Sequence, residues 1–320
     1  MGKLRDAIAS RLGGRAGSLS IEPAAETSVV ELAEEIAEHP ETVELPDGRR
    51  LGYADVGDPD GAPLVLHHGF PNSRVFAALF DEIGRERGVR VLAPERPGVG
   101  VSDPDPDRHL ADFAGDVGSL ADTLGVDTFA VLGVSAGSPY ALATAAELPD
   151  RVQRVGVVAG LAPMGSVGLR ERLWYYGARF VPAGTKLALY LSLRRARLDR
   201  EAFLEGLAED AAPADRALWT DETGRVIHAS MLEARRVNGL DPLVRETALF
   251  GSPWGVDLEA IAVPVYLWYG KADTIVPPAM GTYLARTIPT AEAHFYPDLG
   301  HLSTVADNEG RIFETLAGGD

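Results

Sequence analysis

Cysteine is absent from the 320 residues of this sequence, and its absence excludes several kinds of protein. Without thiols the chain cannot be a disulfide-stapled scaffold, use a cysteine nucleophile or build a cysteine metal site. Lysine is almost absent too, because only Lys3, Lys186 and Lys271 stand among the 30 basic residues. No internal repeat or low-complexity segment is visible, and a 46% share of hydrophobic residues excludes disorder as the main state.

Positive charge is scarce as a whole, since 47 acidic residues against 30 basic ones give a formal net charge of −17. Such a chain repels nucleic acid and anionic lipid, so we expect neither to be a main partner. An acidic, lysine-poor surface is typical of proteins from a salt-rich cytoplasm. A GC-rich genome with a mildly acidic surface explains the same statistics, and the sequence leaves both explanations open.

Long apolar runs are also missing, because charges interrupt every candidate membrane span. Residues 1–8 carry positive charge but lack the apolar segment of a signal peptide. We therefore expect a cytoplasmic protein with no membrane span. The length suffices for one large α/β domain or two modest ones.

Residues 1–40 are predicted to form a helical extension. Apolar residues recur at helical spacing over 4–12, which favours a short helix that packs on the body or frays, with a membrane-surface helix as the alternative. A second helix is better marked. Ser28 followed by Glu31 is typical of a capping box, and Pro40 lies just beyond the expected helix end.

Short apolar runs alternate with helical stretches from residue 41 onward. A hairpin is expected over 41–54, around the turn Pro46-Asp47-Gly48. Six further strands are expected at 63–68, 89–93, 128–134, 152–159, 263–269 and 292–296. Helices are expected between them, near 74–86, 110–125, 136–148 and 279–287. Strands buried on both faces and separated by helices predict an α/β fold, with a mostly parallel eight-stranded sheet covered by helices on both faces.

A long helical stretch interrupts this alternation after the sixth strand. Residues 162–255 show helical periodicity and no strand-like run, so we expect a helical cap over the carboxyl ends of the strands. The predicted domains are the extension at 1–40, the core at 41–161 and 256–320, and the cap at 162–255. Cap aromatics are expected to line an apolar substrate pocket, unless they only pack the cap onto the sheet. The candidates are Trp174, Tyr175 and Phe180.

The strongest chemical signal is the segment Gly133-Val134-Ser135-Ala136-Gly137. An apolar strand precedes it and a helix follows, which is the context of a nucleophile elbow. So sharp a turn strains the serine backbone and admits only very small residues on either side. The hydroxyl then lies at a helix N-terminus, where the dipole favours developing negative charge. Ser135 is therefore the predicted nucleophile.

A serine hydroxyl needs a base, and the base needs an orienting acid. Among the seven histidines, His301 lies in a turn just after the last predicted strand, where its ring can reach across the carboxyl edge of the sheet. Asp273 follows the preceding strand directly. The chain order Ser135, Asp273, His301 is the one expected for this triad. A turn cap is the alternative interpretation of Asp273.

An oxyanion hole is predicted at the segment Leu66-His67-His68-Gly69-Phe70-Pro71. The backbone N–H after the nucleophile, on Ala136, supplies one donor, and the Phe70 N–H supplies the other. Gly69 lets the chain turn tightly there, and Pro71 holds it. His68 is expected to brace the loop by hydrogen bonding to the backbone, without taking part in the chemistry.

These segments together resemble the α/β-hydrolase family over residues 41–161 and 256–320. The segment 94–103, Pro-Glu-Arg-Pro-Gly-Val-Gly-Val-Ser-Asp, is similar to the family's D-R-P-G-x-G-x-S loop, with Glu95 in place of the aspartate. The His-Gly-Phe-Pro loop at 68–71 looks like those of epoxide hydrolases, haloalkane dehalogenases and haloperoxidase-type esterases. The first two use an aspartate nucleophile, which Ser135 argues against.

The resemblance and the triad imply a serine hydrolase that needs no cofactor or metal. Its expected partner is a small-molecule substrate, an apolar or uncharged acyl compound such as a carboxylic ester, cleaved through an acyl-enzyme; a homo-oligomer is left open. The same triad could instead cleave a thioester, an amide or a C–C bond, or form peracids. A non-catalytic ligand-binding protein is the alternative from another class, and its hallmark would be a damaged triad.

Overall fold

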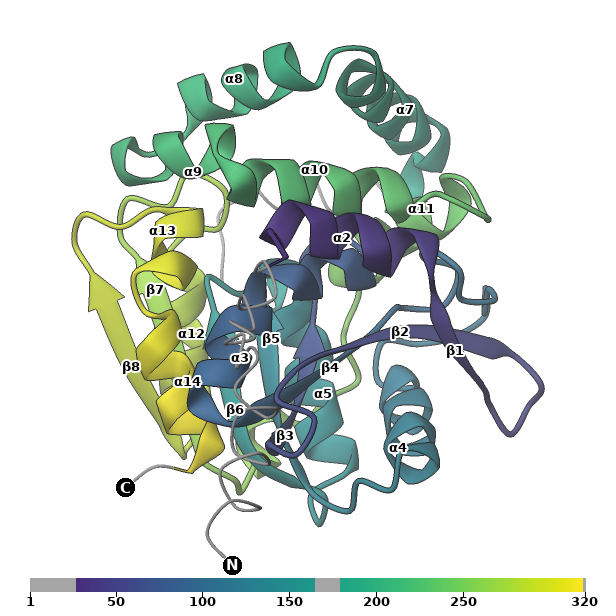
Figure 1. Ribbon diagram of the computed structural model, residues 1–320. Coiled ribbons are helices and arrows are strands. Elements are labelled where there is room, and N and C mark those ends of the chain that lie inside the picture. Colours follow the sequence, from purple (N-terminus) through teal and green to yellow (C-terminus); the bar gives the residue numbers. More distant parts are fainter. Residues whose placement is uncertain (1–26, 165–178, 319–320) are drawn as a thin grey trace, which may run out of the picture.

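A computed structural model describes residues 27–164 and 179–318. Its centre is an eight-stranded sheet in the order β1-β2-β4-β3-β5-β6-β7-β8 (Figure 1). The strands are β1 Glu41–Glu44, β2 Arg50–Gly57, β3 Ala62–His67, β4 Val89–Pro94, β5 Phe129–Val134, β6 Val152–Val158, β7 Val265–Gly270 and β8 Ala291–Tyr296. β2 pairs antiparallel with both β1 and β4, and every other pairing is parallel. The predicted mostly parallel eight-stranded sheet is confirmed.

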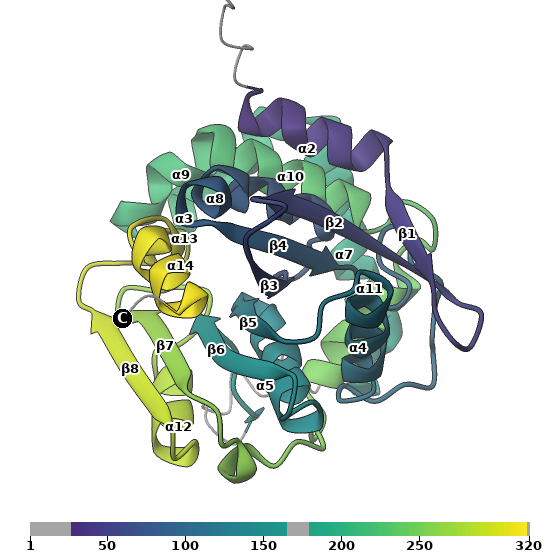
Figure 2. The ribbon, with the colours of Figure 1, turned by 60° about the horizontal axis from the view of Figure 1, so that its bottom comes forward.

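Helices cover both faces of this sheet, which explains why its central strands are apolar runs rather than alternating ones. β5 is buried along its whole length. Figure 2 shows α4, α5 and α12 on one face and α3 and α14 on the other. Their bounds are α3 Asp81–Arg87, α4 Phe113–Thr123, α5 Ser138–Glu147, α12 Ala279–Thr287 and α14 Glu309–Ala317. Each face therefore has its own apolar core.

The chain between β6 and β7 forms a helical insertion. Its described helices are α7 Pro182–Leu198, α8 Arg200–Asp210, η4 Pro213–Asp215, α9 Arg216–Thr220, α10 Glu222–Glu233 and α11 Asp241–Phe250, and the short turn η5 Leu258–Ala260 follows. Figure 1 shows these helices beyond the end of the sheet at which β8 terminates. They therefore lie where the loops after parallel strands meet. Among the described residues, no helix is long and apolar enough to cross a membrane.

The helix predicted after Ser28 is α2, Val29–Glu38. Its capping box forms as expected: the Ser28 N–H donates to Glu31 Oε2 at 2.9 Å, and the Glu31 N–H donates to Ser28 Oγ at 3.2 Å. α2 packs against η1, Arg74–Phe80, and against α10. Ala33 of α2 is buried there beside Val226 of α10. The helix expected at 4–12 lies outside the described residues.

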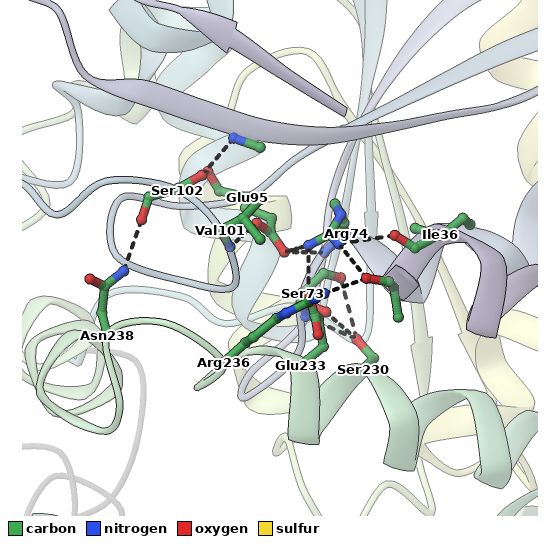
Figure 3. A network of polar contacts seen from close by, with 12 residues as sticks. Ile36, Ser73, Arg74, Glu95, Val101, Ser102, Ser230, Glu233, Arg236 and Asn238 are labelled. Carbon is green, nitrogen blue, oxygen red and sulfur yellow. Dashed lines mark hydrogen bonds and ion pairs between the residues drawn. The ribbon is translucent and has the colours of Figure 1, made fainter. Parts of the chain in front are cut away.

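A buried guanidinium joins three parts of the chain at this contact (Figure 3). Arg74 Nη1 lies 2.7 Å from Glu95 Oε1 and 2.9 Å from Glu233 Oε1 of α10. Arg74 Nη2 donates to the Ile36 carbonyl of α2 at 2.9 Å. Glu95 Oε2 also accepts the Val101 N–H at 2.8 Å. The glutamate that departs from the family motif thus fixes its own loop and holds Arg74.

Candidate active site

Ser135 follows β5 directly and begins the turn η2, Ser135–Gly137, that leads into α5. Its φ of +55° is in the left-handed region, which is strained for a serine. A Cβ at Gly137 would overlap the carbonyl oxygen of His67, and a Cβ at Gly133 would lie 2.6 Å from Ser138 Cα. Both positions therefore require glycine, as a nucleophile elbow does.

His301 begins α13, His301–Ala306, and its ring is paired with Asp273. His301 Nδ1 lies 2.8 Å from Asp273 Oδ2. Asp273 Oδ1 accepts the backbone N–H groups of Ile275 at 2.7 Å and Val276 at 2.8 Å. The Asp273 side chain is 1% exposed, so the carboxylate is fixed by backbone donors on one side and by the imidazole on the other. This arrangement can hold a proton on Nδ1 and leave Nε2 as the base.

Ser135 and His301 line a common cavity of about 280 Å³. Within the described residues, no hydrogen bond joins Ser135 Oγ to His301. Catalytic hydrogen bonds are often long in a free enzyme and tighten when substrate binds. The cavity wall is mainly apolar, and the helical insertion contributes to it from α8, α9 and α10. These wall residues are Leu207, Trp219, Ile227 and Met231.

The loop after β3 lies beside Ser135 and carries one of the two predicted oxyanion donors, the Phe70 N–H. Gly69 and Phe70 line the cavity. The Phe70 N–H donates to no acceptor in the described part of the chain. Ala136 is the second residue of η2, where a backbone N–H has no partner within the turn. Two N–H groups are thus available on the two segments that flank the Ser135 side chain.

Arg96 braces this loop from behind. Its Nη1 donates to the His68 carbonyl at 2.7 Å and its Nη2 to the Gly69 carbonyl at 3.0 Å. His68 adds a contact of its own, since Nδ1 lies 2.9 Å from Gly69 O. Burial, helped by Arg96, lowers the pKa of His67 to about 3 and that of His68 well below its ordinary value. Both shifts favour the neutral form of the imidazole ring.

Arg96 is held in turn by Glu246 of α11, which is fully buried. Arg96 Nε lies 2.6 Å from Glu246 Oε2, and Arg108 pairs with Glu246 Oε1. Tyr140 Oη of α5 donates to the same carboxylate at 2.9 Å. A carboxylate on the insertion therefore holds Arg96, which in turn binds the loop after β3. The sequence motif contains Arg96, but nothing in it indicates that Glu246 is the partner.

Asp215 of η4 was also missed by sequence reasoning. Its Oδ2 accepts the backbone N–H of His301 at 2.6 Å. Its Oδ1 accepts the N–H of Ser303 at 2.9 Å and the Ser303 hydroxyl at 2.6 Å. Asp215 is 1% exposed, so it caps the start of α13 from within the insertion. No local pattern around Asp215 signals this contact.

Of the three aromatic residues predicted to line the pocket, the structure describes Phe180. Trp174 and Tyr175 lie outside the described residues. Phe180 is 73% exposed and is not part of the cavity wall. Among the described aromatic residues of the insertion, Trp219 lines the cavity. In the described ranges, no group of three His, Asp or Glu side chains is arranged as metal ligands.

Comparison with known proteins settles the family. A family model described as alpha/beta hydrolase fold matches residues 62–305. The chain belongs to the α/β-hydrolase fold family. A 2-hydroxymuconate semialdehyde hydrolase of Pseudomonas putida is 27% identical over 284 residues, covering 85% of this chain and 92% of the relative.

Two further α/β-hydrolase comparisons cover most of the chain. A 2-hydroxy-6-oxo-6-phenylhexa-2,4-dienoate hydrolase of Burkholderia cepacia is 30% identical over 275 residues, covering 79% of this chain and 85% of the relative. An alpha/beta hydrolase enzyme from a Medee basin deep-sea metagenome library has a TM-score of 0.67 at 20% identity. That match covers 88% of this chain and 98% of the solved one. The second likeness concerns the fold alone.

Proposed function

We propose that this α/β hydrolase cleaves carboxylic esters, with Ser135 as nucleophile, His301 as general base and Asp273 as the acid that orients it. The observation that carries the proposal is the 2.8 Å contact between His301 Nδ1 and Asp273 Oδ2, on a histidine that shares a cavity with Ser135. A serine held at a φ of +55° at the start of a helix supports the same role.

In the proposed reaction Ser135 Oγ attacks the ester carbonyl carbon while His301 Nε2 takes the hydroxyl proton. Negative charge develops on the carbonyl oxygen, where the N–H groups of Phe70 and Ala136 receive it. Loss of one such donor costs about 3–4 kcal/mol of transition-state stabilisation. His301 then gives its proton to the leaving alcohol. Water, activated by the same base, hydrolyses the acyl-enzyme and releases Ser135.

The cavity supports an apolar or uncharged substrate. Its described wall contains no lysine or arginine, and its one carboxylate is Glu309. An anionic substrate would lie beside that carboxylate without a compensating cation, which is costly in an apolar site. We propose 162–255 as the cap over this cavity, 41–161 and 256–320 as the core, and 1–40 as an extension. Leu207 and Ile227 on the cavity wall support the cap assignment.

Hydrolysis of a C–C bond is the second candidate, and the names of the curated relatives favour it. One relative acts on a dienoate, which is a carboxylate. In this cavity such an anion would face the carboxylate of Glu309, and the described wall has no basic side chain to balance its charge. The ester reaction is therefore the better match to this cavity.

Labelling with a fluorophosphonate probe tests the proposal. The wild type should be labelled, Ser135→Ala should not, and Ser119→Ala on α4 is the matched control that should label normally. A panel of neutral esters, a neutral diketone and a dienoate then separates the bond types, with the esters expected to turn over fastest. Labelling that persists in Ser135→Ala would overturn the mechanism, and preference for the dienoate would overturn the substrate class.

A further inference from the structure

Helix α7 is apolar on two opposite sides. One side packs inward, where Leu193 and Ala196 are buried against α8, α10 and α11. The other side carries three exposed leucines, Leu187 at 58%, Leu191 at 55% and Leu198 at 68%. Spacings of four and seven residues place these leucines in one stripe along the helix. That stripe faces away from the buried side, so it has no partner among the described residues.

Most of the large apolar side chains that are exposed in the described part of the chain lie on or next to that helix. Phe180 and Val181, just before α7, are 73% and 59% exposed. Elsewhere in the described residues, the large hydrophobic side chains with comparable exposure are Val237 and Ile275. Contiguous apolar patches on a surface mark sites of interaction, whereas single exposed residues do not.

The charge of α7 is opposite to that of the whole chain. The segment Pro182–Leu198 contains four basic residues and no acidic one, in a protein with a net charge of −17. Lys186 is paired with Asp241. The other three, Arg194, Arg195 and Arg197, have no acidic partner in the described part of the chain. Arg195 donates to the Ala202 carbonyl at 3.4 Å, so none of the three guanidinium charges is balanced by a described carboxylate. Unbalanced basic residues beside exposed leucines are a combination that favours binding to an anionic lipid surface.

We propose that α7 docks the protein on an anionic lipid surface, although the net charge of the whole chain, from which no such partner is expected, opposes this binding. The three leucines would enter the boundary between headgroups and acyl chains. The arginines, whose aliphatic stems lie along the same surface, would reach the headgroup phosphates. The acidic remainder of the protein is repelled by the same surface. Among the described residues, binding is therefore expected at this helix.

A second copy of the chain is the competing occupant, and the charge pattern argues against it. The acidic surface of a second copy would attract the arginines but would offer little apolar surface to the leucines. The main exposed apolar surface that the structure describes lies on 180–198 itself. Two such helices face to face would oppose their arginines. An anionic bilayer supplies phosphates and an apolar layer together, so it matches both parts of the surface.

The position of α7 suits such docking. Figure 1 shows α7 and α8 at the outer edge of the helical insertion, on the far side of α10 from the sheet. α7 packs on α8 and α10, which line the cavity through Leu207 and Ile227. Docking would thus bring lipid close to the cavity wall. The inference does not depend on which bond the enzyme cleaves.

Vesicle flotation tests the proposal without using activity. Vesicles of phosphatidylglycerol mixed with phosphatidylcholine should carry the full-length protein, and pure phosphatidylcholine vesicles should carry far less. Replacing Arg194, Arg195 and Arg197 by glutamine should weaken partitioning to the anionic vesicles about 100-fold, since each basic residue contributes about 5-fold. Replacing Leu187, Leu191 and Leu198 by glutamine should weaken partitioning to the anionic vesicles about 10-fold or more. Val237→Gln is the matched control and should bind as the wild type does.

Thermal unfolding checks that every variant is folded, which is expected because all replaced side chains are exposed. Wild-type protein that fails to float with anionic vesicles would overturn the proposal, as would flotation that both α7 variants retain. Analytical ultracentrifugation tests whether a second copy of the chain binds this face instead. A dimer that the leucine variant abolishes, without vesicle binding by the wild type, would assign the face to a second copy instead.

Discussion

Asp215 Oδ2 accepts the backbone N–H of His301 at 2.6 Å, so a carboxylate of the helical insertion fixes the residue proposed as the base. The Asp215 carboxylate also packs closely against Gly300, where a Cβ would lie 2.6 Å from Asp215 Cγ. Asp273 contacts the ring of His301, whereas Asp215 accepts its backbone N–H. The insertion and the proposed catalytic base therefore cannot move independently.

The first prediction concerns Asp215 as a positioning residue. Asp215→Asn replaces one of two acceptor oxygens by an N–H₂ donor that must face a backbone N–H of α13. We expect kcat to fall about 10- to 100-fold, because a shift of about 1 Å at a catalytic group costs this much, with KM nearly unchanged. Ester hydrolysis well below the melting temperature measures the effect. A variant that only melts earlier, with kcat intact, would show that Asp215 is purely structural.

The second prediction concerns Glu246, which lies between Arg96 and Arg108. Glu246→Gln leaves two buried guanidinium groups without a full counter-charge, and breaking a buried pair costs about 3–5 kcal/mol of unfolding free energy. Asp122→Asn is the matched control, because Asp122 pairs with Arg151 at the surface and should cost at most about 1 kcal/mol. Urea unfolding measures both. Equal small losses in the two variants would contradict the bracing role.

The third prediction concerns the pH dependence of stability. Burial, together with Glu82 and Glu86, raises the pKa of Glu309 above its ordinary value of about 4.5. Asp221 and Glu222 line the same surface cavity and add to the negative charge. The folded state thus binds the Glu309 proton more tightly than the unfolded state does. This stabilisation is complete below the ordinary pKa and is lost as pH rises through the raised one.

Glu309→Gln removes that titration. The unfolding free energy of the variant minus that of the wild type should therefore increase as pH rises from about 4.5, then level off. Urea unfolding across this pH range is the measurement. A difference that shrinks with rising pH would mean that the surroundings of Glu309 stabilise its charged form.

The fourth prediction concerns the length of the acyl chain. If the apolar cavity receives it, kcat/KM should rise about 4-fold for each added methylene until the cavity is full. Met231→Trp on the cavity wall should lower the chain length at which the rise stops, while acetyl ester turnover stays close to that of the wild type. A flat profile in the wild type would place the acyl chain elsewhere.

Much of the sheet follows from the sequence because strands buried on both faces are short apolar runs. The boundaries differ where local chemistry intervenes. The strand expected to begin at Val263 begins at Val265, because Pro264 has no N–H to give to a neighbouring strand. Its carbonyl still accepts the Val155 N–H at 2.9 Å. The prediction identified the strand and placed its start two residues too early.

Some residues of the candidate site can be predicted from the sequence and others cannot. Ser135, Asp273 and His301 are marked by local motifs after strands, so the sequence can indicate them. Asp215 and Glu246 act on segments 86 and 138 residues away, and such pairs depend on which helix lies over which loop. Phe180 fails as a cavity residue for a related reason. An aromatic composition predicts apolar contact but does not say which side of the helix makes it.

Arg74 links helix α2, at the edge of the fold, to helix α10 of the insertion. Because Arg74 binds the end of α2 and Glu233 of α10 at once, detaching α2 would leave a buried guanidinium short of an acceptor. The two helices should therefore open together in hydrogen exchange, as one cooperative unit. α10 also forms a wall of the cavity, so a chain shortened past residue 38 would lose rigidity at the substrate site. Helix α2 is therefore expected to stabilise the cavity wall through Arg74 and α10.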